Sequence, residues 1–125
     1  MTEVATEIDA GVIGVGSMGR HHARVYSELS EANLVGVYDV DAEQATQVAQ
    51  KTGTKSLQLD ELLASVEIAS IAVPTAYHYE MATKAIEEGV HVLVEKPFVD
   101  ERDKGEMLLA QAHDNDVIVQ VGHVE

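Results

Sequence analysis

The chain has no cysteine, few basic residues and no long apolar run. The absence of cysteine excludes disulfides, thiolate metal sites and a cysteine nucleophile. No apolar run is long enough to cross a bilayer, and the first residues lack the charged, apolar and small-residue succession of a secretory leader. We therefore expect a soluble protein with no membrane partner, and a cytoplasmic location fits this composition.

Lysine and arginine total 8 against 22 aspartates and glutamates, which gives a formal net charge of −14. This balance argues against a nucleic-acid partner, because a phosphate backbone would be repelled. The acidic residues are dispersed among apolar periodic segments and therefore do not form a disordered tail. An acidic surface with only five lysines suggests adaptation to a salty cytosol, where screening removes self-repulsion. That hypothesis predicts a higher melting temperature in molar KCl than in dilute buffer.

A length of 125 residues fits one domain, residues 1–125, and leaves no room for a second. Apolar segments of strand length alternate with segments of helical periodicity, which is the pattern of repeated βα units. We predict strands at 10–13, 33–37, 54–58, 68–73, 90–94 and 117–121, and helices at 17–29, 42–51, 60–64, 77–88 and about 100–113. Right-handed crossovers then give an α/β fold with a doubly wound, parallel, six-stranded sheet in the Rossmann order 3-2-1-4-5-6.

Polar residues and glycines mark the expected helix ends. Aspartate is a favoured N-cap and glycine a favoured C-terminal stop. We therefore expect N-caps at Asp41, Asp60 and Asp100 with Asp103, and exits at Gly53, Gly89 and Asn115.

Three glycines follow the first predicted strand, at Gly14, Gly16 and Gly19. A strand, a tight glycine turn and a helix in this order present unpaired backbone N–H groups to a pyrophosphate. Gly14 would allow the turn, Gly16 would let a phosphate approach the backbone, and Gly19 would let the helix lie close to the sheet. The alternative is a turn that happens to contain glycine.

An acidic residue ends the second predicted strand. Asp39 lies 20 residues beyond Gly19, where a dinucleotide-binding domain places the acid that binds the adenosine ribose. A carboxylate there would repel a 2′-phosphate and so favours NAD over NADP. The alternative is that Asp39, with Asp41, only ends a strand and caps the next helix.

Three polar clusters follow predicted strands, at 14–19, 74–78 and 95–97. Because ligands of such sheets bind at the carboxyl ends of the strands, this coincidence predicts a site there. The histidines do not suggest a metal: His21 and His22 point about 100° apart on one helix, and His91, His113 and His123 have no ligand spacing. A serine hydrolase is also excluded, since no nucleophile elbow or triad is present.

In order along the chain, the runs GVGSMGRHH at 14–22, VYDVD at 37–41, VPT at 73–75 with His78, VLVEKP at 92–97 and VGHVE at 121–125 resemble the signatures of one family. This is the glucose–fructose oxidoreductase / inositol dehydrogenase (Gfo/Idh/MocA) family of nicotinamide-dependent sugar dehydrogenases. The resemblance covers residues 10–125. It implies an NAD-dependent dehydrogenase that oxidises a sugar or sugar-nucleotide hydroxyl.

The resemblance also implies roles for individual residues. Backbone groups at Gly16, Ser17 and Met18 would hold the pyrophosphate, and the turn at Pro74 and Thr75 would line the cofactor near its nicotinamide. The full cofactor-binding set is Gly14, Gly16, Ser17, Met18, Gly19, Asp39, Val73, Pro74, Thr75, His78, Glu95 and Lys96. Lys96 would be catalytic, because its ammonium could stabilise the alkoxide that develops as hydride leaves. The alternative for Lys96 is a solvated lysine paired with Glu95.

Members of the resembled family continue into a second α/β domain that binds the sugar and mediates assembly into homo-oligomers. We therefore expect this chain to be the cofactor half of such an enzyme and to be inactive alone. One alternative is a module that senses NAD or NADH without chemistry. Another is an S-adenosylmethionine domain, which would leave Glu95, Lys96 and Pro97 without a role.

Overall fold

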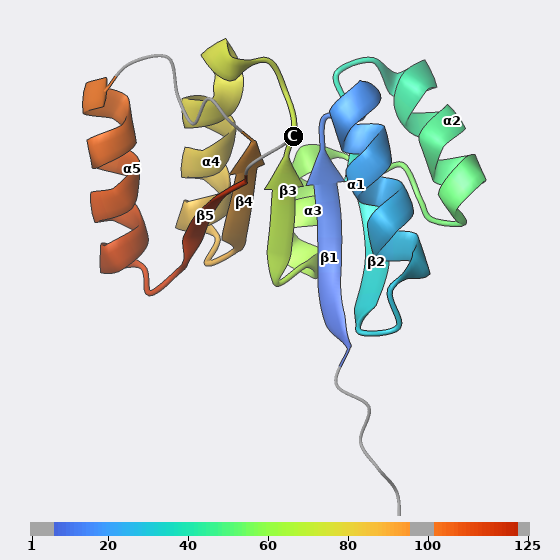
Figure 1. The fold of residues 1–125 in the computed structure, drawn as a ribbon, viewed down its shortest axis with the longest axis horizontal. Helices are drawn as coiled ribbons and strands as arrows, with labels where there is room; N and C mark the ends of the chain where they lie inside the picture. The colour runs from blue at the N-terminus through green and yellow to red at the C-terminus, as the bar shows by residue number, and fades with distance from the viewer. Residues whose placement is uncertain (1–6, 96–101, 123–125) are drawn as a thin grey trace, which may run out of the picture.

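The computed structural model describes residues 7–95 and 102–122. Its centre is a five-stranded parallel sheet in the order β2-β1-β3-β4-β5 (Figure 1). The strands are β1 (Ile8–Ile13), β2 (Ala32–Tyr38), β3 (Ile68–Ile71), β4 (His91–Glu95) and β5 (Val119–Gly122). The predicted α/β parallel sheet is confirmed, with five strands in place of six.

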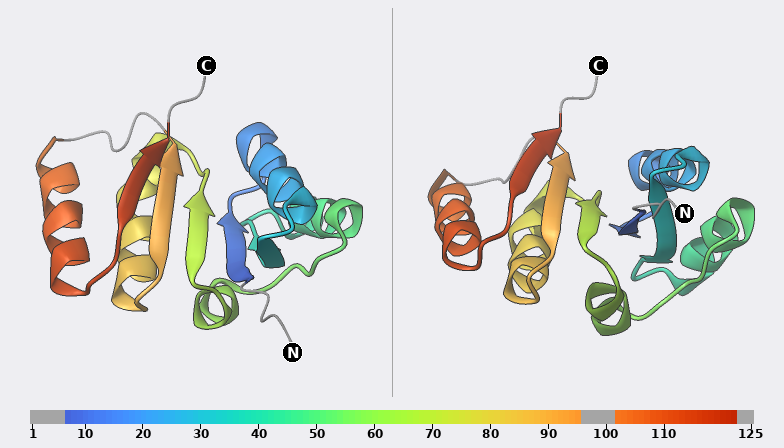
Figure 2. Two further views of the ribbon diagram at one scale, coloured as in Figure 1. Left: turned by 60° about the horizontal axis from the view of Figure 1, so that its bottom comes forward. Right: turned by 90° about the horizontal axis from the view of Figure 1, so that it is seen from below.

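Helices cover both faces of the sheet. The helices are α1 (Ser17–Glu28), α2 (Ala42–Thr52), α3 (Leu59–Ser65), α4 (His78–Glu87) and α5 (Arg102–Asp114), and a 3-10 turn, η1 (Thr75–Tyr77), precedes α4. Figure 2 shows α1 on the opposite side of the sheet from α3, α4 and α5. Consecutive β1 residues face these two sides, because side chains alternate along a strand: Val12 packs with α1 and α2, and Ile13 with α3, α4 and α5.

The predicted strand at 54–58 is reduced to one isolated bridge between Ser56 and Val37. The Val37 N–H donates to the Lys55 carbonyl at 2.8 Å, and the Leu57 N–H donates to the Val37 carbonyl at 2.9 Å. The segment is short, and Lys55, Ser56 and Gln58 are exposed, so little apolar burial holds it against the sheet edge. Its place beside β2 is nevertheless the one that the predicted order assigns to the missing strand.

Several predicted helix ends agree with the structure. The Asp41 carboxylate accepts from the Gln44 N–H at 3.2 Å, and Gly53 and Gly89 follow their helices with φ of 74° and 77°. The prediction that Asp60 caps α3 is wrong, because Gln58 is the N-cap and forms a capping box with Glu61.

The exit after α5 also differs from the prediction. Asp116, not Asn115, has the positive φ, at 57°. Asn115 instead remains bonded to the last turn, since its side-chain amide donates to the Gln111 carbonyl at 2.9 Å. The predicted cap at Asp100 and Asp103 falls on residues whose side chains lie outside the described part.

A small polar cluster lies between α1 and the sheet. Ser70 of β3 is fully buried, and its hydroxyl lies 2.7 Å from the Tyr26 hydroxyl and 3.1 Å from His22 Nδ1. Burial raises the pKa of Tyr26 above its usual value, and the hydrogen bond to Ser70 partly opposes that rise. The cluster gives Ser70 the partners that a buried hydroxyl needs.

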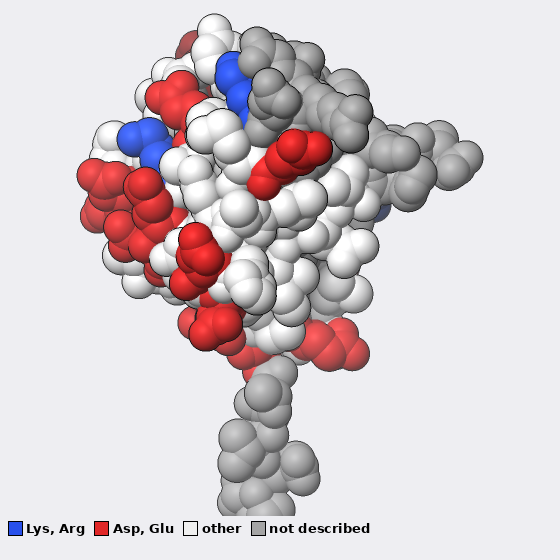
Figure 3. Space-filling model, turned by 90° about the vertical axis from the view of Figure 1, so that its left-hand side faces the viewer, with Lys and Arg blue, Asp and Glu red and all other residues white. Residues whose placement is uncertain are grey.

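Carboxylates are spread over the surface. Figure 3, which views the α5 side, shows many more acidic than basic side chains, scattered among neutral ones. Among the described helices, none is long and apolar enough to span a membrane.

Candidate functional site: a cleft at the strand carboxyl ends

The strand ends that precede the polar clusters are brought together by the register of the sheet. Ile13 of β1 is paired with Tyr38 of β2 and with Ile71 of β3. Ile71 is paired in turn with Val94 of β4. The loops after β1, β2 and β3 therefore leave the same edge, and they enclose a cleft of about 770 Å³.

The glycine turn between β1 and α1 is closely packed at two of its three glycines. Gly14 has φ of 90°, and a Cβ there would lie 2.8 Å from Val73 Cγ1 and 2.9 Å from the Ala72 carbonyl oxygen. A Cβ at Gly19 would overlap the Gly14 carbonyl oxygen. Gly14 needs glycine because its φ is positive and the residues after β3 lie against it, and Gly19 needs glycine because the backbone of α1 lies directly against the glycine turn.

Gly16 differs from the other two glycines. A Cβ at this position would meet no atom within 4 Å, so the space in front of it is open. Gly16 is also the N-cap of α1, and no side chain caps the helix. The first turn of α1, with Ser17 and Met18, lines the cleft, where free N–H groups and the helix dipole attract an anion.

Asp39 connects the glycine turn to β2. Its Oδ2 accepts from the Val15 N–H at 2.8 Å and from the Gln44 side-chain amide at 3.1 Å. Its Oδ1 accepts from the Asp41 N–H at 2.8 Å. The carboxylate is thus held at the cleft edge, beside the first turn of α1.

The turn after β3 forms the other wall of the cleft. Val73 and Pro74 line it, together with Tyr77, Glu80 and Met81 from η1 and α4. His78 is only 2% exposed, and its Nε2 lies 2.8 Å from the Val73 carbonyl oxygen. The ring therefore lies behind the turn and supports it, and direct contact of His78 with a cofactor stays a prediction.

The predicted site is only partly covered by the described residues. Seven of its members line the cleft: Gly14, Gly16, Ser17, Met18, Asp39, Val73 and Pro74. Lys96 lies outside the described residues, as do the side chains of Thr75 and Glu95. Within the described ranges, no set of three or more His, Asp or Glu side chains could hold a metal ion.

Sequence reasoning missed the other residues that line the cleft, namely Tyr38, Val40, Gln44, Ala72, Tyr77, Glu80 and Met81. Val40 and Tyr77 are exposed by 85% and 54%, so both present apolar surface at the cleft. The position of Val40, two residues after the end of β2, could have identified it, and Tyr77 belongs to the turn that joins β3 to α4. Gln44 lies in the first turn of the helix that follows Asp39. This spacing in the sequence could have predicted its contact with the Asp39 carboxylate.

The charge of the cleft favours binding through the backbone. Among the described residues that line it, none is lysine or arginine, and Asp39 and Glu80 are carboxylates. A bound pyrophosphate would therefore be held by N–H groups of the glycine turn, and the carboxylate side is suited to hydroxyl donors.

Comparison with known proteins gives a consistent result. A family model for the NAD-binding Rossmann fold of GFO_IDH_MocA oxidoreductases matches residues 8–123. The UDP-N-acetylglucosamine 3-dehydrogenase of Acidithiobacillus ferrooxidans is 39% identical over 116 residues, which are 92% of this chain and 36% of that protein. Its solved structure has a TM-score of 0.90 at 37% identity and is matched over 93% of this chain and 38% of that one.

Two further proteins extend the comparison. The glucose-6-phosphate 3-dehydrogenase of Bacillus subtilis is 40% identical over 88 residues, 70% of this chain and 25% of that protein. The structure of GenD2 from gentamicin A biosynthesis, in complex with NAD, has a TM-score of 0.90 at 33% identity and is matched over 97% of this chain and 36% of that one. The chain thus spans between a quarter and two fifths of these proteins' lengths.

Proposed function

The chain belongs to the Gfo/Idh/MocA family of oxidoreductases with an NAD-binding Rossmann fold, and from this premise we propose that it is the cofactor-binding part of an NAD-dependent sugar dehydrogenase. The whole enzyme would transfer hydride from a hydroxyl of a sugar or sugar nucleotide. This part alone would bind the cofactor without turning over substrate.

The proposal rests on two neighbouring features of the cleft: a glycine with free space in front of it, and a carboxylate held in place by hydrogen bonds. Gly16 leaves free space at the uncapped start of α1, where the pyrophosphate of a dinucleotide fits. Asp39 is held next to that turn by its bond to the Val15 N–H. A carboxylate in this place accepts hydrogen bonds from the ribose hydroxyls.

Asp39 also supports NAD over NADP. A 2′-phosphate would bring a dianion against this carboxylate, and the two like charges repel. The neighbouring Gln44 amide already donates to Oδ2 of Asp39 at 3.1 Å, so it reinforces a site for a neutral ribose. The adenine would lie between the apolar surfaces of Val40 and Tyr77.

Lys96 is the proposed catalytic residue. In the sequence, Lys96 comes directly after Glu95, the last residue of β4. The end of β4 is in register with the end of β3, where Val94 pairs with Ile71. When bound, the cofactor accepts the hydride from the substrate carbon. A lysine ammonium at this point would hydrogen-bond the substrate hydroxyl and stabilise the developing alkoxide.

The substrate class is proposed from the relatives. The proteins compared above act on UDP-N-acetylglucosamine and glucose-6-phosphate according to their names. Because this chain spans only 36% of the first of these, the sugar site would lie in the part of such an enzyme beyond this chain. That part would also mediate assembly of a homo-oligomer.

The first experiment is a fluorescence titration of the 125-residue chain with NADH, NADPH and S-adenosylmethionine. We expect NADH to bind more tightly than NADPH and S-adenosylmethionine not to bind. Failure to bind NADH would refute the cofactor assignment, and tighter binding of S-adenosylmethionine would replace it.

The second experiment tests Lys96 in a full-length enzyme. Lys96→Ala should lower kcat far more than it weakens NAD binding. Lys104→Ala is the matched control, because Lys104 lies over the Tyr79 ring at 5.7 Å and does not line the cleft. Turnover that survives Lys96→Ala would refute the catalytic role of Lys96. A full-length protein that binds NADH and shows no turnover on any sugar would favour the alternative of a module that senses NAD(H).

A further inference from the structure

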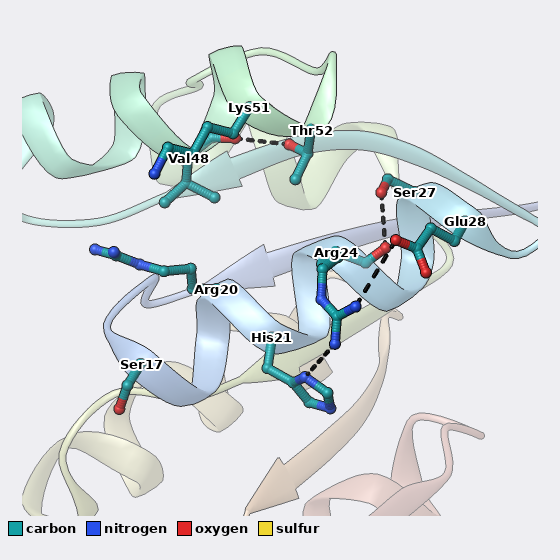
Figure 4. A pocket seen from close by; sticks show the side chains of 9 residues that line it. All are labelled: Ser17, Arg20, His21, Arg24, Ser27, Glu28, Val48, Lys51 and Thr52. Carbon is teal, nitrogen blue, oxygen red and sulfur yellow. Dashed lines mark hydrogen bonds and ion pairs between the residues drawn. The ribbon is translucent and has the colours of Figure 1, made fainter.

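A second hollow lies between α1 and α2, with a volume of about 510 Å³ (Figure 4). We call it the α1–α2 groove. It is lined by Arg20, Arg24 and Lys51, which are three of the eight Lys and Arg residues in a chain of net charge −14. Glu28 is the one carboxylate among its described lining residues. The groove is therefore locally cationic on a strongly acidic protein.

The three cations are not equivalent. Arg24 is engaged, because its Nη1 lies 3.9 Å from Glu28 Oε2 and its Nη2 lies 3.2 Å from His21 Nδ1. In the part of the chain that the structure describes, no carboxylate pairs with Arg20 or Lys51. The positive charge that remains uncompensated in the groove thus belongs to these two residues.

Arg20 and Lys51 reach into the groove from opposite helices. Figure 4 shows the Arg20 side chain extending toward the end of α1 that carries Ser17, and the Lys51 ammonium extending from α2 over the same hollow. Helical side chains lean toward the N-terminus of their helix, which explains the direction of Arg20. Both cationic side chains therefore border the same hollow.

The groove also meets the cofactor cleft. Ser17 lines both hollows, so they adjoin at the first turn of α1. The positive end of the α1 dipole adds to the attraction for an anion there. The two hollows nevertheless differ in chemistry, because the described lining of the cofactor cleft contains no lysine or arginine.

We propose that the α1–α2 groove binds a phosphate group through the Arg20 guanidinium and the Lys51 ammonium. A guanidinium can donate two parallel hydrogen bonds to phosphate oxygens, and a lysine ammonium adds a compact charge. Two sources offer this chemistry: free inorganic phosphate, and the 2′-phosphate of NADPH bound in the adjoining cleft. Phosphate binding here requires no hydride transfer, so it can be tested separately from the proposed enzyme activity.

The test uses the ¹⁵N-labelled 125-residue chain, titrated with inorganic phosphate at constant ionic strength. Amide shifts should centre on Arg20 and Lys51, and Arg20→Ala with Lys51→Ala should weaken binding about tenfold or more, because both charge-assisted contacts are lost. The double variant Lys55→Ala with Lys84→Ala removes the same charge from exposed positions outside the groove, and it should change the affinity less than about twofold. Equal losses in the two double variants, or no loss in the first, would overturn the proposal.

Titration with NADH and NADPH separates the two sources. If the 2′-phosphate occupies the groove, Arg20→Ala weakens NADPH binding about fivefold and leaves NADH binding within about twofold. If the ratio of the two affinities is unchanged while phosphate binding is lost, the occupant is free phosphate. Phosphate that displaces NADH and shifts only the amides of Gly16, Ser17 and Met18 would occupy the pyrophosphate position and would refute the groove site. NADH binding is also measured in the groove variants. Its result tests the proposed cofactor-binding function separately from the groove proposal.

Discussion

The two walls of the cofactor cleft are built in different ways. The wall formed by the β1–α1 turn is mainly backbone, with Gly14, Gly16 and the first turn of α1, and the end of β2 adds side chains such as Asp39 to it. The wall after β3 consists mainly of side chains, among them Tyr77 and Met81. A substitution that adds atoms should therefore disturb the packing of the backbone wall. A substitution that removes atoms from the side-chain wall should only reduce its contacts with a ligand. The comparison indicates that the wall formed by the glycine turn tolerates less substitution than the opposite wall.

The strongest test of the backbone wall is Gly19→Ala. The new Cβ would overlap the Gly14 carbonyl oxygen, so α1 must move away from β1. We expect the free energy of unfolding to fall by about 3 kcal/mol, as in other overpacked sites, although alanine in a helix is otherwise better than glycine by about 1 kcal/mol. Urea denaturation followed by circular dichroism measures this, and an unchanged stability would show that the close packing is not required.

The support of the side-chain wall is tested by His78→Phe. This change removes the donor that lies 2.8 Å from the Val73 carbonyl oxygen and should cost about 2 kcal/mol of unfolding free energy, the usual range for a lost partner. The affinity for NADH should fall as well, because the turn at Val73 and Pro74 loses its anchor. His78→Gln, which can still donate, is the control and should recover part of both losses. Equal losses in the two variants would show that the hydrogen bond to the Val73 carbonyl does not anchor the turn.

Asp39→Asn tests the carboxylate that connects the two parts of the backbone wall. We expect NADH affinity to fall about tenfold, or about 1.4 kcal/mol, because the charge-assisted bonds to the ribose weaken. NADPH affinity should fall less, since the repulsion of its 2′-phosphate is relieved. Asp41→Asn is the matched control, because Asp41 caps α2 and does not line the cleft. Fluorescence titration would contradict the prediction if both variants lost NADH equally.

Gly16→Ala sharpens the comparison within the backbone wall itself. The position has φ of −68° and free space for a Cβ, so the stability should change by only about 0.5 kcal/mol. A methyl group there would stand where the pyrophosphate approaches, and NADH affinity should fall about fivefold, or about 1 kcal/mol. The same urea and fluorescence measurements apply. Loss of stability without loss of affinity would reverse the roles of Gly16 and Gly19.

The smallest effect is expected at Tyr77→Ala on the side-chain wall. Tyr77 is 54% exposed, so its removal should leave the stability nearly unchanged. The adenine would lose one apolar contact, and NADH affinity should fall about twofold, or about 0.4 kcal/mol. Calorimetric titration can resolve this change. A loss as large as that of Asp39→Asn would mean that the side-chain wall carries much of the affinity.

The sequence predicted those features that depend on short local patterns. The spacing of Gly14, Gly16 and Gly19 requires a tight turn, and the apolar runs of the strands identify a sheet buried on both faces. The order of the five strands follows from right-handed crossovers. Because the carboxyl ends of parallel strands share one edge, the position of the cleft was predictable as well.

Features that depend on tertiary contacts were not predictable in the same way. The segment around Ser56 forms only a bridge, because its pairing depends on how much Leu57 can bury against β2. The start of α3 at Leu59 depends on the reciprocal bonds of Gln58 and Glu61. The direction of the His78 ring follows from the carbonyl of Val73, which becomes its partner only after the turn has folded.

The glycine turn is joined to β2 by two short hydrogen bonds. The Gly14 N–H donates to the Tyr38 carbonyl at 2.7 Å, and the Val15 N–H donates to Asp39 Oδ2 at 2.8 Å. The glycine turn and the end of β2 are therefore joined into one unit before any ligand arrives. Binding to such a unit loses little conformational entropy, so the association rate should be set by diffusion rather than by ordering of the loop.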